Sequence, residues 1–314
     1  MGQVIACANQ KGGVGKTTTV VNLASYLAMA GDRVLVLDLD PQGNATSGLG
    51  LDRNTLDGSV YDAVIDDVSL RELLVPGPME GLTVAPSSIA LAGAEIELAP
   101  LEQRERRLAR LVTAVADDFD YIFIDSPPSL GLLTVNALTA ADSVLIPIQC
   151  EYYALEGLTQ LIATVNLVRD HLNPDLALKG VVLTMYDART NLSADVAREV
   201  RRHLGSAVFD TVIPRSVRLS EAPSHGLPIS LYRPDSRGAE AYAALAVELR
   251  ARDGHAVPEG DPERTVGTAA QAAVDTSSAD PQSDPVVAGA AGAAGAVNSR
   301  SSDPGAVGHA VVVS

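Results

Sequence analysis

The sequence of 314 residues contains no tryptophan, and aromatic residues make up only 4% of it. Apolar residues nonetheless account for 46%, so a core has to be built from alanine, valine, leucine and isoleucine. Only two cysteines are present, Cys7 and Cys150, each within an apolar run. Two such cysteines exclude a disulfide framework and a cysteine-rich metal site, and they are typical of a protein from a reducing cytosol.

Long apolar runs are also missing, since no segment approaches the ~18 apolar residues that a membrane-spanning helix requires. The N-terminus lacks the charged leader of a signal peptide and the residue pattern of a myristoylation signal. We therefore expect a cytoplasmic protein. The formal net charge of −16 argues against a protein that coats nucleic acid with its whole surface, but it does not exclude a local basic patch.

Residues 255–314 contain no leucine, isoleucine, methionine, phenylalanine or tyrosine. Seven acidic residues oppose two basic ones there, which gives this segment a net charge of −5. So few apolar groups cannot offset the conformational entropy that is lost on ordering. We predict a disordered acidic tail over 255–314, rich in alanine, glycine, serine and proline, and a folded domain over 1–254.

Within the folded domain, short apolar runs alternate with segments of helical periodicity. Runs such as 34–37 and 122–124 are continuously apolar, as is typical of parallel strands that are buried on both faces. The alternation predicts a doubly wound α/β fold, with a mostly parallel sheet, helices on both faces and a ligand site at the carboxyl ends of the strands. Strands are predicted over 4–8, 33–38, 82–85, 121–125, 143–149, 178–184 and 211–213, and helices over 17–30, 104–116, 155–171, 193–204 and 238–252.

The most informative feature that is present is a glycine run, residues 11–18 (KGGVGKTT), between the first strand and the first helix. That context is typical of a phosphate-binding loop, because glycines let backbone N–H groups face a phosphate and the helix N-terminus adds positive charge. Lys16 supplies a charge to the outer phosphates, and the hydroxyl of Thr17 can bind Mg²⁺. The residues predicted to contact a nucleoside triphosphate are Lys11, Gly12, Gly13, Val14, Gly15, Lys16, Thr17 and Thr18.

This loop departs from the usual pattern at its start, where Gln10 replaces a glycine and Lys11 adds a second cation. Two of the three lysines of the chain therefore lie in one short loop. A lysine at position 11 points away from the loop's own phosphates, so it is a candidate to reach the nucleotide of a neighbouring subunit. The alternative is a solvated loop lysine.

Two further predicted strands end in acids, Asp38 and Asp40 after one strand and Asp125 after the other. Because the carboxyl ends of parallel strands meet at one edge, we expect these acids near the glycine loop. Asp125 fits an acid that holds Mg²⁺ through a water. Asp40 is the candidate to orient the attacking water. Asp38 either supports it as a second catalytic acid, or caps a helix or pairs with Lys16.

These motifs resemble those of the ParA/Soj chromosome-partitioning ATPases, whose loop is known as a deviant Walker A motif. The resemblance covers roughly residues 1–250 and rests on segments 11–18, 38–46, 124–128, 149–157, 184–191 and 214–223. It implies a P-loop ATPase domain over 1–254 that uses ATP and Mg²⁺, with Lys11, Lys16 and Asp40 in the catalytic site, to which we add Asp38 from the residues themselves. Pro214 falls at the family's adenine pocket.

The resemblance also implies an ATP-dependent homodimer in which Lys11 reaches the phosphates of the partner. Such a dimer binds double-stranded DNA without sequence preference, through Arg189 and Arg218, and so associates with the nucleoid. A ParB/Spo0J-type centromere-binding partner then stimulates hydrolysis and releases the dimer. From the residues alone, the basic excess within 179–218 is modest and is also typical of a solvated helix face.

Three other functions are consistent with this fold class. The first is a MinD-like ATPase at a membrane surface, which needs a basic amphipathic helix where this chain has an acidic tail. The second resembles the nitrogenase iron protein, but Cys7 and Cys150 form no iron–sulfur ligand set. The third is a binding module without catalysis, against which Lys16, Asp40 and Asp125 argue. We therefore expect an ATPase that partitions a chromosome or a plasmid and that does not bind membranes.

Overall fold

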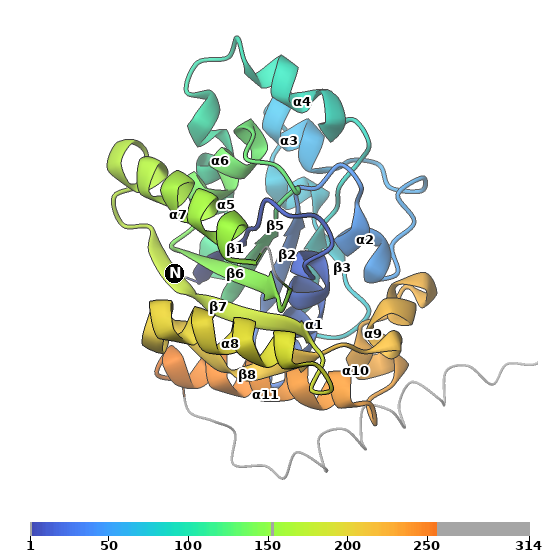
Figure 1. The fold of residues 1–314 in the computed structure, drawn as a ribbon. Helices are drawn as coiled ribbons and strands as arrows, with labels where there is room; N and C mark the ends of the chain where they lie inside the picture. The colour runs from blue at the N-terminus through green and yellow to red at the C-terminus, as the bar shows by residue number, and fades with distance from the viewer. Residues whose placement is uncertain (1, 152–153, 256–314) are drawn as a thin grey trace, which may run out of the picture. The chain divides into compact units, whose positions relative to one another are not determined.

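The structure is a computed structural model that describes residues 2–151 and 154–255. Within these residues, eight strands form one sheet in the order β3-β4-β2-β5-β1-β6-β7-β8 (Figure 1). Neighbouring strands are parallel except that β3 is antiparallel to β4. The strands are β1 (Gln3–Cys7), β2 (Val34–Asp38), β3 (Val75–Pro76), β4 (Leu82–Ala85), β5 (Tyr121–Asp125), β6 (Ser143–Gln149), β7 (Ala177–Tyr186) and β8 (Val208–Pro214).

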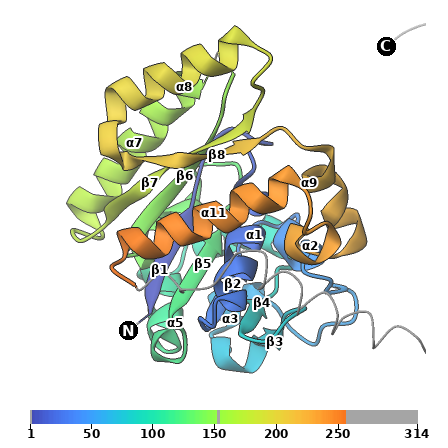
Figure 2. The ribbon, with the colours of Figure 1, turned by 90° about the horizontal axis from the view of Figure 1, so that it is seen from below.

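Helices cover both faces of this sheet, and Figure 2 shows α1 and α11 together on one of them. Alternate residues of each central strand contribute to two separate cores. In β1, for example, Ile5 packs with α1 and α11, whereas Ala6 packs with helices of the other face. The helices are α1 (Lys16–Met29), α2 (Asn44–Gly48), α3 (Val60–Asp66), α4 (Leu91–Leu98), α5 (Arg107–Thr113), α6 (Leu132–Ala140), α7 (Ala154–His171), α8 (Asn191–Leu204), α9 (Val217–Glu221), α10 (Ile229–Tyr232) and α11 (Arg237–Arg252).

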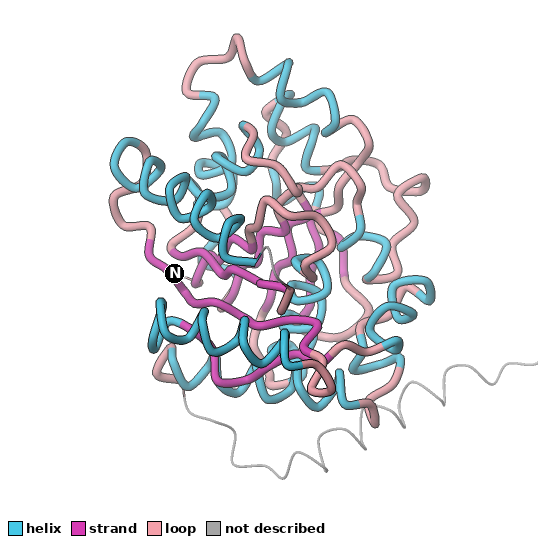
Figure 3. The backbone as a smooth tube through the Cα atoms, viewed as in Figure 1, coloured by secondary structure: helices cyan, strands magenta, loops and turns pink. Residues whose placement is uncertain are grey.

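The doubly wound α/β fold is confirmed. β2 and β5 are buried along their whole length, as their continuously apolar sequences indicate. Figure 3 shows the strands of the sheet enclosed by helices. The predicted strands 82–85, 121–125 and 143–149 coincide with β4, β5 and β6. Edge strand β3 was not predicted, because its two residues carry no periodic signal. None of the described helices is long and apolar enough to cross a bilayer.

One predicted helix, 104–116, is wrong as a continuous element. A short 3₁₀ turn, Arg104–Arg106, precedes α5 instead. The amide of Asn136 in α6 donates to the carbonyl of Arg104 at 2.8 Å and accepts from the N–H of Leu108 at 3.2 Å. In a continuous helix those two backbone groups would bond to each other, so a side chain distant in sequence replaces one helical hydrogen bond.

The predicted tail lies outside the described residues apart from His255. The backbone N–H of His255 donates to the carbonyl of Arg250, and its ring lies 5.8 Å from that of Tyr121. The end of α11 is held on the sheet by an ion pair between Lys179 and Asp253, both of which are nearly buried. The described residues thus include the first residue of the predicted tail.

Candidate nucleotide-binding site

The glycine loop connects the end of β1 to the start of α1. Gly13 and Gly15 have φ values of 73° and 90°, a left-handed conformation that glycine adopts without strain. Gly15 is also the N-cap of α1 and provides no side-chain cap. The N–H groups of the first helical turn are therefore available to an anion, where the helix dipole favours negative charge.

A cavity of about 400 Å³ lies over this loop. Seven residues predicted from the sequence line it: Gly12, Gly13, Gly15, Lys16, Thr17, Thr18 and Asp40. Gln42 and Asn44, which we did not predict, line it as well. Val14 lies beneath the loop, almost fully buried, and its carbonyl accepts a hydrogen bond from the hydroxyl of Thr184 at 2.8 Å. The loop is thus anchored from below and open above.

A neighbouring cavity of about 330 Å³ is lined by Pro214 together with Gly15, Thr18, Thr184 and Met185. The structure therefore brings Pro214, the predicted adenine-pocket residue, next to the glycine loop. Met185 lines both cavities and has a φ of 51°, which is unusual for a residue with a side chain. Backbone strain of this kind concentrates at functional sites.

Thr17 and Asp125 form a pair at the bottom of the site. The Thr17 hydroxyl donates to Asp125 Oδ2 at 2.7 Å, while Asp125 Oδ1 is buried without a hydrogen-bond partner among the described residues. Burial raises the pKa of Asp125 well above its usual value, and the charge of Asp38 raises it further. An unpartnered carboxylate oxygen beside a threonine hydroxyl fits a hydrated Mg²⁺, which would supply charge neutralisation on nucleotide phosphates.

Asp38 is completely buried and serves as an anchor for the loop that follows β2. Its carboxylate accepts hydrogen bonds from the backbone of Asp40 at 3.2 Å and from both the N–H and the hydroxyl of Thr46, at 2.8 and 2.7 Å. Burial raises the pKa of Asp38 to about 6, although these three donors favour its charged form. Asp38 thus holds the backbone around Asp40.

Ser87, just after β4, extends this network and was not predicted. Its hydroxyl donates to the carbonyl of Asp40 at 2.6 Å, and its N–H donates to the hydroxyl of Thr46 at 2.9 Å. No motif marks this serine in the sequence, because its role depends on β2 and β4 being neighbours in the sheet. The loop that carries Asp40 is therefore fixed from two strands.

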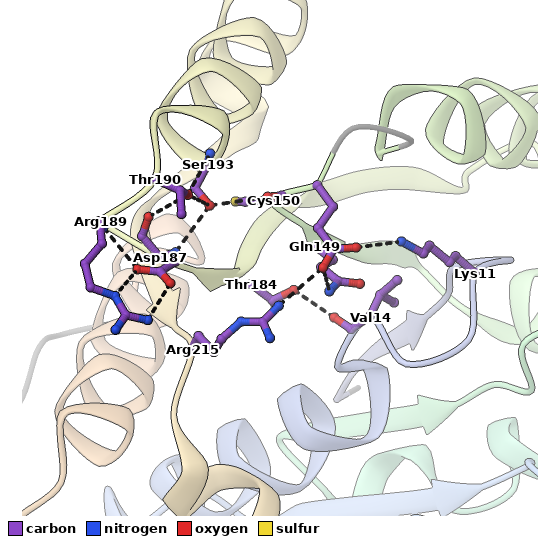
Figure 4. Close-up of polar contacts among 11 residues, drawn as sticks. Lys11, Val14, Gln149, Cys150, Thr184, Asp187, Arg189, Thr190, Ser193 and Arg215 are labelled. Carbon is purple, nitrogen blue, oxygen red and sulfur yellow. Dashed lines mark hydrogen bonds and ion pairs between the residues drawn. The ribbon is translucent and has the colours of Figure 1, made fainter.

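Lys11 does not line the cavity over the loop. Its Nζ lies 3.4 Å from Glu151 Oε2, and Arg215 lies 3.3 Å from the other oxygen of the same carboxylate (Figure 4). The amide of Gln149 also donates to Glu151 at 2.6 Å. Glu151 was not among the predicted site residues, although its place just after the carboxyl end of β6 was a signal of the site.

The two predicted DNA-binding arginines, Arg189 and Arg218, line one cavity of about 530 Å³, together with Arg215 and Arg237. Both are already paired within the chain. Arg189 makes two hydrogen bonds with the carboxylate of Asp187, and Arg218 lies 2.7 Å from Glu221. The Arg189 guanidinium holds the pKa of Asp187 below its usual range. The structure thus brings these arginines together but also gives them internal partners.

The fold, the glycine loop and the acids around it define a P-loop nucleotide-binding protein. A family model described as an AAA domain matches residues 2–178. The chain is 60% identical to the sporulation initiation inhibitor protein Soj of Bacillus subtilis over 251 residues, which are 80% of this chain and 99% of that protein. It is 53% identical to the chromosome partitioning protein ParA of Myxococcus xanthus, over 81% of this chain and 89% of that protein.

Two groups of solved structures are also similar. A cobyrinic acid a,c-diamide synthase from Mycobacterium smegmatis, with bound ADP and magnesium, is 41% identical with a TM-score of 0.71, covering 83% of this chain and 100% of that one. The cell division ATPase MinD of Pyrococcus furiosus is 26% identical with a TM-score of 0.68, covering 80% and 100%. With its 50–60% identical relatives named Soj and ParA, the chain belongs to the Soj/ParA family of chromosome-partitioning ATPases.

Proposed function

We propose that this ATPase is a nucleotide switch that binds DNA as an ATP-bound homodimer and leaves it after hydrolysis. The observation that carries the proposal is the pair of Thr17 and Asp125 under the glycine loop, with one buried carboxylate oxygen left for a hydrated cation. Asp40 lines the same cavity. A metal position and a water-orienting acid beside one phosphate loop are the parts that triphosphate hydrolysis needs.

In this proposal ATP binds with its phosphates on the loop from Gly12 to Thr18 and its base near Pro214. Lys16 neutralises the outer phosphates, while Thr17 and, through a water, Asp125 would hold the Mg²⁺ that neutralises phosphate charge. Asp40 orients the attacking water, and Asp38 positions Asp40 rather than contacting the reacting atoms. Catalysis then rests on positioning and charge, which is sufficient for phosphoryl transfer.

Lys11 acts across the dimer. Lys11 does not line the cavity over its own loop and contacts Glu151 instead, which supports a lysine that serves a second subunit's phosphates. Arg189 and Arg218 then contact DNA phosphates from both subunits, which places the dimer on the nucleoid. A ParB/Spo0J-type centromere-binding protein stimulates hydrolysis. The names of the similar proteins Soj and ParA support this role in partitioning.

Sizing of the full chain with ATP, with ADP and without nucleotide tests the switch. The wild type is expected to dimerise only with ATP and to return to the monomer as ATP is consumed. Asp40→Ala is expected to form a dimer that persists, because hydrolysis is blocked, and Lys11→Ala is expected to remain a monomer. Asp52→Ala, an exposed acid outside the cavity lining, is the control.

A wild-type monomer in all three conditions would overturn the proposal. A Lys11→Ala protein that dimerises with ATP like the wild type would overturn the role of that lysine. Co-sedimentation of the ATP-bound protein with liposomes separates the proposal from a MinD-like function. Retention on lipid without retention on DNA would favour that alternative.

A further inference from the structure

An exposed apolar stripe runs along α4 and the turn that precedes it. Ile89 and Ile96 are 70% and 79% exposed, which is unusual for large aliphatic side chains in a folded domain. They are seven residues apart and so lie on one side of the helix. Ala92 and Ala99, also exposed, continue the same line. We call Ile89, Ala92, Ile96 and Ala99 the α4 stripe.

The α4 stripe has the spacing of a helix–helix contact. Its members are separated by three, four and three residues, and large side chains alternate with alanines that permit close approach. The helical turn begins at Ile89, whose carbonyl accepts from the N–H of Ala92 at 3.0 Å. The stripe therefore presents a seam that a second helix can cover.

Acids flank the stripe on both sides. Glu97 accepts a hydrogen bond from the hydroxyl of Tyr61 in α3 at 2.7 Å, and Glu95 faces the N–H of Leu133 at the start of α6. A second copy of this chain would bring like charges together across the seam. The chain's own segment 255–314 is acidic as well, with a net charge of −5. Both occupants are disfavoured by charge.

We propose that the α4 stripe docks a basic amphipathic helix of a partner protein. Apolar residues of that helix would cover Ile89 and Ile96, and lysines or arginines beside them would face Glu95 and Glu97. This arrangement is the helix-in-groove mode of recognition, in which apolar anchors provide affinity and the charges select the partner.

The position of α4 links this docking to hydrolysis, a step that rests on the proposed function. On one side the segment that leads into α4 contains Ser87, which holds the carbonyl of Asp40. On the other side Glu95 contacts the start of α6, in the segment that follows Asp125. A helix bound on the stripe therefore acts on both loops that carry the acids of the site.

A single introduced thiol tests the proposal in the full chain. The native cysteines are buried, with exposed fractions of 0% for Cys7 and 2% for Cys150. Ile96→Cys thus provides the one accessible thiol among the described residues, and its rate of maleimide labelling reports whether the stripe is covered. Val247→Cys is the matched control, since Val247 is 44% exposed on α11, which lies far from α4 (Figure 1).

The probes are a synthetic amphipathic helix of leucine and lysine and the same helix with glutamate in place of each lysine. We expect the basic helix to slow the labelling of Ile96→Cys by about tenfold. Adding Ile89→Ser to the Ile96→Cys variant is expected to abolish most of this protection from labelling, because anchor residues dominate such contacts. Labelling of Val247→Cys stays unchanged, and the acidic helix protects neither site.

Three results would overturn the proposal. Equal protection of both thiols means only general attraction to an acidic protein. Slow labelling of Ile96→Cys without any peptide means that the α4 stripe is already covered. The cover is a second copy of the chain if the labelling rate depends on protein concentration, and the chain's own tail if it does not. Absence of protection by the basic helix also excludes the proposed partner helix.

Basal ATP hydrolysis, measured on the same samples, tests the proposed function separately, because maleimide labelling does not require ATP turnover.

Discussion

At the scale of single residues, the carboxylate of Glu151 holds Lys11, the lysine that we propose to act on the nucleotide of the partner subunit. It contacts Lys11 and Arg215, and the Lys11 and Glu151 side chains are 40% and 42% exposed. A pair this exposed contributes only about 0–1 kcal/mol to folding, because water screens it. Its effect is therefore on where Lys11 lies rather than on the stability of the fold.

We predict that Glu151→Gln leaves the unfolding midpoint nearly unchanged but lets the ATP-bound dimer form at a protein concentration up to about fivefold lower. The amide removes the charge that holds Lys11 on its own subunit, and a gain of at most about 1 kcal/mol corresponds to that factor. Sedimentation of a dilution series with ATP measures it. Glu199→Gln, which removes a comparable surface pair with Arg202, is the control. Dimerisation that is unchanged or weaker would contradict the prediction.

Asp38 gives a second prediction at this scale, in the pH dependence of stability. Burial raises its pKa to about 6, above the value of about 3.9 in an unfolded chain. The folded state therefore binds a proton at Asp38 more tightly than the unfolded state does. This difference in proton binding stabilises the folded state by about 2–3 kcal/mol. The stabilisation is complete below about pH 4 and is lost as the pH rises through about 6.

Urea unfolding of the nucleotide-free protein between pH 4 and 7 measures this contribution. The difference in free energy of unfolding between the wild type and Asp38→Asn is expected to shrink as the pH rises through that window, because asparagine does not titrate. Asp52→Asn, at an exposed position, corrects for general charge effects. Parallel curves for wild type and Asp38→Asn would show that Asp38 does not titrate in this range.

At the scale of elements, Ser87 couples β4 to the loop after β2. We predict that Ser87→Ala lowers kcat for ATP about tenfold with little change in KM, because Asp40 is left less well positioned while the phosphate loop is untouched. Ser87→Thr keeps the hydroxyl and is expected to restore most of the rate. Ser88→Ala is the neighbouring control, since Ser88 bonds to Ser59 instead. Equal losses in kcat for both alanine variants would indicate a general disturbance of the segment.

Local signals in the sequence were sufficient for the glycine loop, for the central strands and for the fold. Gly13 and Gly15 are recognisable because a phosphate loop needs their backbone conformation, whatever surrounds it. The break before α5 was not recognisable, since it depends on Asn136 from another helix. Ser87 was missed for the same reason, since its role arises from β2 and β4 being neighbours in the sheet. Glu151 follows a predicted strand at the edge where the site was expected, but its contacts with Lys11 and Arg215 are not visible in one sequence.

At the scale of the whole molecule, the proposed function requires an acidic chain to bind DNA through a small surface. Arg189 and Arg218 line one cavity, but each is paired with an acid of its own subunit. In the proposed complex, DNA phosphates therefore compete with Asp187 and Glu221 for the same guanidinium groups. The net charge of −16 opposes approach to DNA as well, so the affinity should depend strongly on salt and on how many subunits contribute.

We predict opposite effects for the two members of the Arg189 pair. Arg189→Ala weakens retention of double-stranded DNA by the ATP-bound protein, whereas Asp187→Asn strengthens it, because its neutral side chain no longer competes with phosphate. ATP turnover without DNA stays unchanged in both. Arg198→Ala, which removes an exposed arginine paired with Asp195 on α8, is the control and is expected to have a smaller effect.

Salt titration of the same variants then counts the subunits on the DNA. Each phosphate contact contributes about 0.9 to the slope of log K against log salt, so a dimer that loses Arg189 from both subunits loses about 1.8, and a bound monomer about 0.9. A decrease near the larger value supports a dimer in which both copies of Arg189 contact the duplex. A slope that does not change in Arg189→Ala would show that this arginine stays with Asp187 on DNA, and that the basic surface lies elsewhere on the chain.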